Sequence, residues 1–359
     1  MIGVDFGTTN SCVAIRDAFG SIESVLVATG NRPPYDTVLR SAVLNPEDAG
    51  RSVGEEALQR AEAAPAGSRL LVSFKPFLDE HQLRRMERRV VGQKHTYDPL
   101  EEAELIVPEY ASVWVGGEER YSRGELISGT AAMLGHLLER AVEAGGDPSQ
   151  VWLGMPVSFS SCARQRLLAA LHEAADGRGR RFFPTYHDVL RSVRFVLEPV
   201  AVAAGPIMRE AYDAGDAENV LVFDHGGGTL DLSLLRFERH PKFDGLVPTR
   251  ELAVGGSREV AGRSLDGAFR RSLEQREDFR SAAANMRDYL VNQFVESCKI
   301  RLSNEDSADA LPGVEATREQ LEHSAVAVLD EIETLVRGVV DYAGLDLADV
   351  DRVILTGGS

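Results

Sequence analysis

The chain has 359 residues, more than a single hydrophobic core normally supports, so we expect at least two domains. Its 39 basic and 56 acidic residues give a formal net charge of −17, which argues against nucleic acid as a general partner because phosphate backbones would be repelled. Its three cysteines, Cys12, Cys162 and Cys298, are far apart and form no CxxC pair, which argues against a disulfide framework and a cysteine zinc site.

The N-terminal segment MIGVDFGTTN has no basic stretch followed by a long apolar one, so it does not look like a secretory signal. No stretch of the chain approaches 18 uninterrupted apolar residues, which argues against a membrane span. We therefore expect a cytoplasmic monomer whose partners include neither a membrane nor a nucleic acid.

Strands and helices alternate along the sequence, which is typical of an α/β protein. In chain order the pattern predicts a strand–glycine turn–strand unit at 2–15, strands at 24–29, 40–45 and 103–108, a helix at 122–145, a strand at 151–157, a helix at 161–175, a second strand–turn–strand unit at 220–235, helices at 286–302 and 317–344, and a strand at 352–357. A unit that recurs once at such a long separation favours two related lobes over a solenoid.

Both strand–turn–strand units place an aspartate at the end of an apolar run and follow it with glycine and threonine. The matching residues are Asp5, Gly7 and Thr8 in the first unit and Asp224, Gly226 and Thr229 in the second. A glycine turn lets backbone N–H groups converge on phosphate oxygens. Carboxylates beside phosphate indicate a divalent cation, because Mg²⁺ prefers carboxylate, water and phosphate oxygens. The units therefore favour a polyphosphate with Mg²⁺; the alternative is two ordinary tight hairpins with acidic flanks.

The segments IGVDFGTTNS, VFDHGGGTLD, LEPVAVAAG and VILTGGS resemble signature segments of the ATPase domain of the heat-shock protein 70 family, within the actin, sugar kinase and heat-shock superfamily. Four intervening segments, NRPPYDTVLRSAVL, SVGEEALQRA, GMPVSFSSCARQR and AGRSLD, are also similar to that family. The resemblance covers nearly the whole chain and indicates a divergent bacterial-type member.

This resemblance implies an actin-like ATPase fold of two lobes, each with a ribonuclease-H-like core, with the nucleotide in the cleft between them. Residues 1–33 and 113–210 would form the core of lobe I and 34–112 its peripheral subdomain. Residues 211–256 and 318–359 would form the core of lobe II and 257–317 its peripheral subdomain. The family's closing helix, linker and peptide-binding domain have no counterpart here, so we expect a piece of a longer protein that cannot clasp a client peptide alone.

The resemblance also implies roles for individual residues around the phosphates. The two phosphate hairpins would be formed by Gly7, Thr8, Thr9 and Asn10, and by Gly226, Gly227, Gly228 and Thr229. Asp5, Asp224 and Asp231 match the acidic residues that hold Mg²⁺ through water, and Asp224 would also orient the attacking water. Lys75 matches the catalytic lysine, acting together with Asp224, Asp5 and Thr229; its alternative is an ordinary solvated lysine.

Other matches concern the nucleoside and the transmission of nucleotide state. Glu296, Lys299 and Ser303 match the helix that holds adenine and ribose, and the alternative is a surface ion pair. The loop that passes close to the nucleotide corresponds to Gly357, Gly358 and Ser359.

Glu198 matches the glutamate that senses the nucleotide and lies near the metal; its alternative is a glutamate at a helix start. Pro156 and Arg164 match residues that relay nucleotide state, and their alternatives are a strand-end proline and a solvated arginine.

Three residues depart from the family pattern: His225, Pro76 and Ile300. The leading interpretation is Mg²⁺-dependent ATP binding and slow hydrolysis that drives lobe closure in a heat-shock protein 70-like chaperone. Its ligands would be ATP or ADP, Mg²⁺ and, as a further candidate, K⁺, and its partners co-chaperones or a nucleotide-exchange factor. The departures favour an alternative, an ATP-sensing regulatory or scaffold module with little turnover. An actin-like filament protein and a sugar kinase are further alternatives.

Overall fold

The computed structural model describes residues 1–8, 10–17, 19–27, 37–45, 51–62, 64, 68–72, 74–79, 112–115, 118–157, 159–210, 217–239, 246–257, 260–284, 286 and 288–357. The chain divides into two units, Met1–Ala201 and Val202–Ser359. The boundary falls within helix α7 (Glu198–Glu210). Among the helices of the described part, none is long and apolar enough to cross a membrane.

The first unit is built on a mixed sheet. In sheet order its strands are β11 (Val193–Leu197), β10 (Val151–Met155), β1 (Ile2–Phe6), β2 (Asn10–Arg16) and β3 (Ile22–Ser24), and β4 (Val38–Arg40) also pairs with β2. Two smaller sheets consist of β6 (Ser52–Val53), β5 (Ala42–Leu44) and β7 (Leu70–Val72), and of β8 (Ser112–Val115) and β9 (Glu118–Ser122). The helices are α1 (Gly54–Glu62), the 3₁₀ helix η2 (Lys75–Leu78), α4 (Arg123–Glu143), α5 (Ser161–Glu173) and α6 (Tyr186–Ser192).

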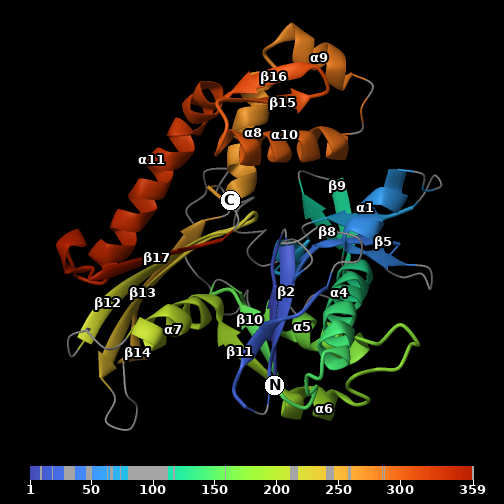
Figure 1. Cartoon of the computed structure of the whole chain (residues 1–359), viewed down its shortest axis with the longest axis vertical. Coiled ribbons are helices and arrows are strands. Elements are labelled where there is room, and N and C mark those ends of the chain that lie inside the picture. The colour runs from blue at the N-terminus through green and yellow to red at the C-terminus, as the bar shows by residue number, and fades with distance from the viewer. Residues whose placement is uncertain are drawn as a thin grey trace. The chain divides into compact units, whose positions relative to one another are not determined.

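Period-2 alternation in β1 decides which face of this sheet is buried. Ile2, Val4 and Phe6 are buried and belong to one core together with Leu134 and Leu138 of α4. Figure 1 shows α4 running beside β2. The other face of β1 carries Asp5 at the end of the strand, and this position is exposed.

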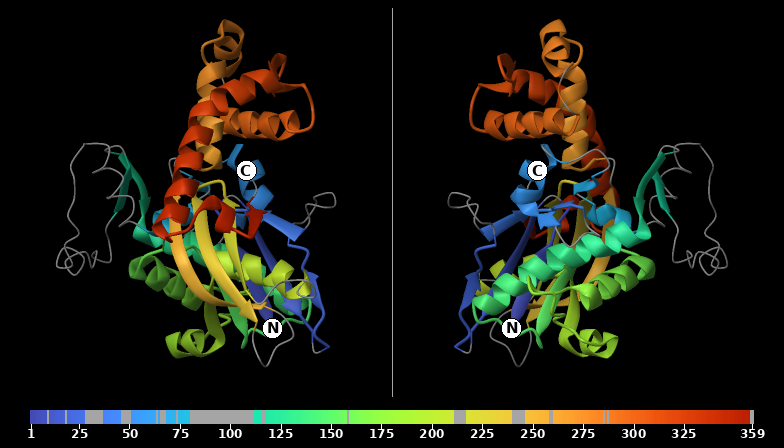
Figure 2. Two further views of the ribbon diagram at one scale, coloured as in Figure 1. Left: turned by 90° about the vertical axis from the view of Figure 1, so that its left-hand side faces the viewer. Right: turned by 90° about the vertical axis from the view of Figure 1, so that its right-hand side faces the viewer.

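The second unit contains a four-stranded sheet in the order β14 (Leu246–Ser257), β13 (Leu230–Arg239), β12 (Ala217–His225) and β17 (Arg352–Thr356). Its other elements are α8 (Gly262–Leu273), α9 (Glu277–Ala283), α10 (Asp288–Leu302), β15 (Ser307–Leu311), β16 (Val314–Thr317), α11 (Arg318–Tyr342) and the 3₁₀ helix η3 (Leu347–Asp349). Helix α11 packs Ile332 and Val339 into the same core as Leu232 and Leu234 of β13. A separate small core joins α8, α9 and α10 to β15 and β16, which lie together beyond the sheet (Figure 2, orange to red).

The two sheets share one connectivity. In each, a first strand pairs antiparallel with the second, the second pairs antiparallel with the third, and a later strand pairs parallel with the first. The strands β1, β2, β3 and β10 correspond in this way to β12, β13, β14 and β17. The prediction of two related lobes from the repeated strand–turn–strand unit is therefore confirmed at the level of sheet topology.

Most predicted elements within the described residues are present with small shifts. The four predicted helices correspond to α4, α5, α10 and α11, and the strands at 151–157 and 352–357 to β10 and β17. The strand prediction at 24–29 is wrong for residues 25–27, because β3 ends at Ser24. The stretch 40–45 contains not one strand but parts of two, because β4 ends at Arg40 and β5, which pairs with β6 and β7 rather than with β2, begins at Ala42. The strand expected at 103–108 lies outside the described residues.

Candidate functional site

The first glycine turn connects β1 to β2. The strands pair Phe6 with Ser11 and Asp5 with Cys12, so the turn consists of the residues between Phe6 and Ser11. A Cβ on Gly7 would lie 2.0 Å from the carbonyl oxygen of Asn10, which no side chain tolerates. The Oγ of Ser41 donates a hydrogen bond of 2.8 Å to the Gly7 carbonyl and so fixes the turn from outside. Gly7, Thr8 and Asn10 therefore lie together in this turn, and Thr9 lies outside the described residues.

The second glycine turn, between β12 and β13, has the same register. His225 pairs with Leu230 and Asp224 with Asp231, so this turn contains the same number of residues as the first. The Gly226 amide donates to the Thr229 carbonyl at 2.9 Å and closes the hairpin. Asp224 and Asp5 thus occupy equivalent positions, each just before its turn.

The carbonyls of the second turn are bonded to the start of α8. The Gly262 amide donates to the Gly226 carbonyl at 2.9 Å, and the Arg263 amide donates to the Gly227 carbonyl at 3.0 Å. Among the described residues, no hydrogen bond is found from the amides of Gly227 or Gly228. A turn whose carbonyls are occupied and whose amides are available is suited to an anion.

Asp224 and Asp231 form a pair of carboxylates directly opposite each other on adjacent antiparallel strands. Directly opposite residues project from the same face of a sheet, with Cβ atoms about 5 Å apart. Asp231 is buried and Asp224 half-buried. Within the described part of the chain, no group of three or more His, Cys, Asp or Glu residues could hold a metal ion. The donor set fits a Mg²⁺ that keeps most of its water ligands better than it fits a cage made by protein alone.

In the first unit, the buried Lys75 forms an ion pair with the half-buried Glu198. Their Nζ and Oε1 atoms are 2.6 Å apart, and the side chains are 5% and 15% exposed. Lys75 also lies over the ring of Phe159, 5.8 Å from its centroid. Lys75 is thus not the solvated lysine of the alternative interpretation, and Glu198 does more than begin α7. Pro76 follows Lys75 inside η2, and the fixed φ of proline suits the first turn of a helix.

The predicted nucleoside residues lie on or just after α10. Lys299 pairs with Asp266 of α8 across 2.8 Å, and its side chain is only 12% exposed, which argues against a simple surface pair. Burial raises the pKa of Asp266, while Lys299 acts in the opposite direction and a nearby Glu296 raises it again. Ser303 follows α10 in an exposed turn and donates to the Lys299 carbonyl at 3.3 Å. Sequence reasoning did not single out Asp266, although it lies within the AGRSLD segment.

Gly357 follows β17 directly, with φ at +99°. A Cβ there would lie 2.2 Å from the His225 carbonyl oxygen, so glycine is required for both conformation and space. Gly358 and Ser359 lie outside the described residues. Pro156 is buried directly after β10, and Arg164 is exposed with its guanidinium 5.5 Å from the Phe195 ring centroid.

His225 is buried and bonded rather than exposed to solvent. Its Nε2 lies 2.9 Å from the Val260 carbonyl oxygen. Burial lowers the pKa of His225, the hydrogen bond to Val260 opposes that shift, and Lys299 lowers the pKa further. At this departure from the family pattern the imidazole therefore makes a hydrogen bond to a neighbouring segment.

Neither Cys12 nor Cys298 has an acidic thiol. Burial raises the pKa of Cys12 to about 11, and the cross-strand carboxylate of Asp5 raises it as well. Burial is also the main cause that raises the pKa of Cys298 to about 11.

Because the thiolate is the reactive form, we expect iodoacetamide at pH 8 to alkylate both thiols about a hundredfold more slowly in the native protein than in the urea-unfolded chain. Peptide mass spectrometry after timed quenching measures this, and native labelling as fast as unfolded labelling would contradict it.

The contact between Gly7 and Asn10 leads to a stability prediction. Gly7→Ala forces the two turn residues apart, and we expect it to lower the free energy of unfolding by about 2 kcal/mol in urea denaturation. Gly3→Ala, in the strand that precedes the turn, is the matched control, because its Cβ would meet nothing closer than the Ala14 oxygen at 3.9 Å. Equal stability of the two variants would show that the turn accommodates a side chain.

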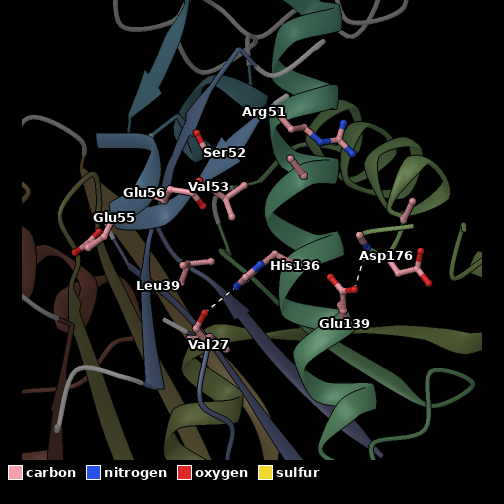
Figure 3. Close-up of a pocket in the computed structure, with 13 residues that line it drawn as sticks. Val27, Leu39, Arg51, Ser52, Val53, Glu55, Glu56, His136, Glu139 and Asp176 are labelled. Carbon is pink, nitrogen blue, oxygen red and sulfur yellow. Dashed lines mark hydrogen bonds between the residues drawn. The ribbon is translucent and has the colours of Figure 1, made fainter. Parts of the chain in front are cut away.

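A cavity of about 230 Å³ in the first unit is separate from these residues (Figure 3). It lies between α1, α4 and the start of the loop after α5, and none of the sequence-predicted site residues lines it. His136 points across it and bonds through Nε2 to the Val27 carbonyl at 2.7 Å.

The two sheets share one connectivity, and each opens with a glycine-turn hairpin of the same register. The chain therefore belongs to the class of proteins with the actin-like ATPase fold. The chain is a member of the Hsp70 protein family, whose family model matches residues 1–359.

Chaperone relatives of several bacteria are similar at low identity. The chain is 26% identical over 387 residues to the chaperone protein DnaK of Akkermansia muciniphila, covering 100% of this chain and 52% of the relative. It is 28% identical over 363 residues to a chaperone protein HscA homolog of Vibrio cholerae, covering 99% and 51%, and 27% identical over 366 residues to one of Acinetobacter baumannii, covering 100% and 51%. The chain therefore spans about half the length of these curated relatives.

Proposed function

We propose that the chain binds ATP with Mg²⁺ and hydrolyses it slowly, with closure of its two lobes as the output. The observation that carries this proposal is the shared register of the two hairpins, which gives each a glycine at the first position of the turn and an aspartate two positions before that glycine. Membership of the Hsp70 family supports the same function.

In this proposal the turn amides of Gly227 and Gly228 donate to phosphate oxygens, and Gly7, Thr8, Thr9 and Asn10 form the other phosphate-binding hairpin. Lys299, Glu296 and Ser303 hold the nucleoside, with Gly357, Gly358 and Ser359 close to it. Asp266 keeps Lys299 in place through their 2.8 Å ion pair.

Hydrolysis requires a water oxygen to form a bond to the γ-phosphorus while the bond to the ADP oxygen breaks. Asp224 orients this water and accepts its proton as attack proceeds. Lys75 offsets the charge that develops on the transferred phosphoryl group. When bound through Asp5, Asp224 and Asp231, Mg²⁺ supplies Lewis-acid stabilisation of the phosphate oxygens.

The test is calorimetric titration of the purified chain with ATP, with Mg²⁺ and then with excess EDTA. We expect one ATP per chain with Mg²⁺ and much weaker binding in EDTA. No heat of binding from a folded sample would exclude the proposal.

A second candidate function is an ATP sensor with little turnover. The short contact between Lys75 and Glu198 favours it, because a lysine whose charge is already compensated stabilises a phosphoryl group less. ATP that binds but stays intact over hours would identify this function.

The relatives are named as chaperones, and these names support a proposal about the cellular role of the chain. We propose that this chain is the nucleotide-binding part of a chaperone that acts in the cytoplasm with co-chaperones or a nucleotide-exchange factor. Pro156, Arg164 and Glu198 would pass the nucleotide state to such partners, and K⁺ would accompany Mg²⁺.

A further inference from the structure

His225 lies at the end of β12, directly before the second glycine turn, with 8% of its surface exposed. Its Nε2 is 2.9 Å from the carbonyl oxygen of Val260. A carbonyl oxygen only accepts hydrogen bonds, so Nε2 carries the proton and the neutral ring holds a single tautomer. Val260 is itself fully buried in the core that joins α11 to the sheet.

The His225–Val260 bond is the first of three consecutive links between the same two segments. The next two run from the Gly262 amide to the Gly226 carbonyl and from the Arg263 amide to the Gly227 carbonyl. The three links join residues 225, 226 and 227 in turn to residues 260, 262 and 263. They run from a core residue to the first turn of α8.

Strand β17 also contacts the backbone at His225. Gly357, at the end of β17, packs against the His225 backbone so closely that a Cβ would lie 2.2 Å from its carbonyl oxygen. The ring of Phe223, one strand repeat earlier on β12, has its centroid 6.1 Å from that of His225. His225 is therefore held from the strand, from β17 and from the segment before α8.

We propose that His225 is a positioning residue: its bond to the Val260 carbonyl sets the peptide planes of Gly226 and Gly227, so that their carbonyls face α8 and the following amides stay available to an anion. The use of those amides by the phosphates of ATP rests on the proposed function, whereas the order of the turn does not. An aliphatic side chain of similar size would fill the same space but could not make the bond.

The experiment is amide hydrogen exchange of the full chain, read by mass spectrometry in peptides that cover 224–231 and 260–265, without nucleotide and then with MgATP. His225→Leu removes the bond and keeps the apolar volume, and His225→Gln offers a donor at the position of Nε2. Loss of one such bond predicts exchange about three- to tenfold faster in His225→Leu, with MgATP binding weakened by a similar factor. We expect His225→Gln to recover most of both.

The matched control is His136→Leu, which removes an imidazole bond to a backbone carbonyl in the other unit. It should leave exchange in both peptides unchanged. Unchanged exchange in His225→Leu, or equally fast exchange in His225→Gln, would overturn the proposal, because the ring would then act only through its volume.

If His225→Leu does not fold, NMR of ¹⁵N-histidine in the wild-type chain decides the question. The proposal requires the Nε2–H tautomer, and an Nδ1–H tautomer overturns it. Fast exchange in His225→Leu combined with a wild-type chain that does not bind MgATP would contradict the proposed function and leave the positioning role intact. A wild-type chain that binds MgATP, combined with unchanged exchange in His225→Leu, would contradict the positioning role and leave the proposed function intact.

Discussion

Asp224→Asn is expected to slow single-turnover hydrolysis of ATP by about 10²- to 10⁴-fold, the range typical of removing a group that transfers a proton in the transition state. Asp224 is the half-buried member of the cross-strand pair with Asp231, at the last position but one before the second turn. Asparagine keeps the size of the side chain and removes both its charge and its ability to accept a proton. Rapid-quench measurement of ADP, with protein in excess over ATP, gives the rate.

The matched control for this variant is Asp309→Asn, an exposed aspartate on β15 in the same unit. It should hydrolyse ATP at the wild-type rate, and both variants should unfold at the wild-type urea concentration. Wild-type turnover by Asp224→Asn would remove Asp224 from the mechanism.

Lys75→Met is expected to lower the free energy of unfolding by about 3 kcal/mol, the lower end of the range for buried pairs, because the 15% exposed Glu198 would lose the cation that compensates its charge. The same variant should abolish detectable hydrolysis, since the cation proposed to stabilise the transferred phosphoryl group is gone. Urea denaturation and single-turnover hydrolysis measure the two effects.

The double variant Lys75→Met/Glu198→Gln separates stability from chemistry. Removing both charges should recover most of the stability, whereas hydrolysis should stay lost. A Lys75→Met chain as stable as wild type would show that the pair is well solvated, and a double variant that hydrolyses ATP would show that Lys75 has no part in the reaction.

Local pattern was sufficient to predict the two hairpins. Apolar alternation up to Asp5 and Asp224 marks strands, and the glycines after them mark the turns. Glycine is required at position 7 because a Cβ there would clash with Asn10, only three residues away. A contact this local can be predicted from a short stretch of sequence. Strand ends were harder to predict. The run at 40–45 divides at Ser41 because β4 pairs with β2 whereas β5 pairs with β6 and β7 of another sheet, which no local pattern reveals.

Contacts between residues far apart in sequence were beyond prediction from pattern. Glu198 and Lys75 were each selected through family resemblance, but their ion pair depends on how η2 meets the start of α7. Asp266 was missed because a lone aspartate in a helix is ordinary until its partner Lys299 is seen. The role of His225 depends in the same way on Val260, 35 positions later.

The most direct test of the central claim is single-turnover hydrolysis by the wild-type chain, with protein in excess over radiolabelled ATP, with Mg²⁺ and with EDTA. We predict that ADP accumulates in a single slow exponential with Mg²⁺ and does not form in EDTA. ATP that remains intact in the presence of Mg²⁺, in a folded sample that binds it, would contradict the claim of hydrolysis and leave a nucleotide sensor in its place.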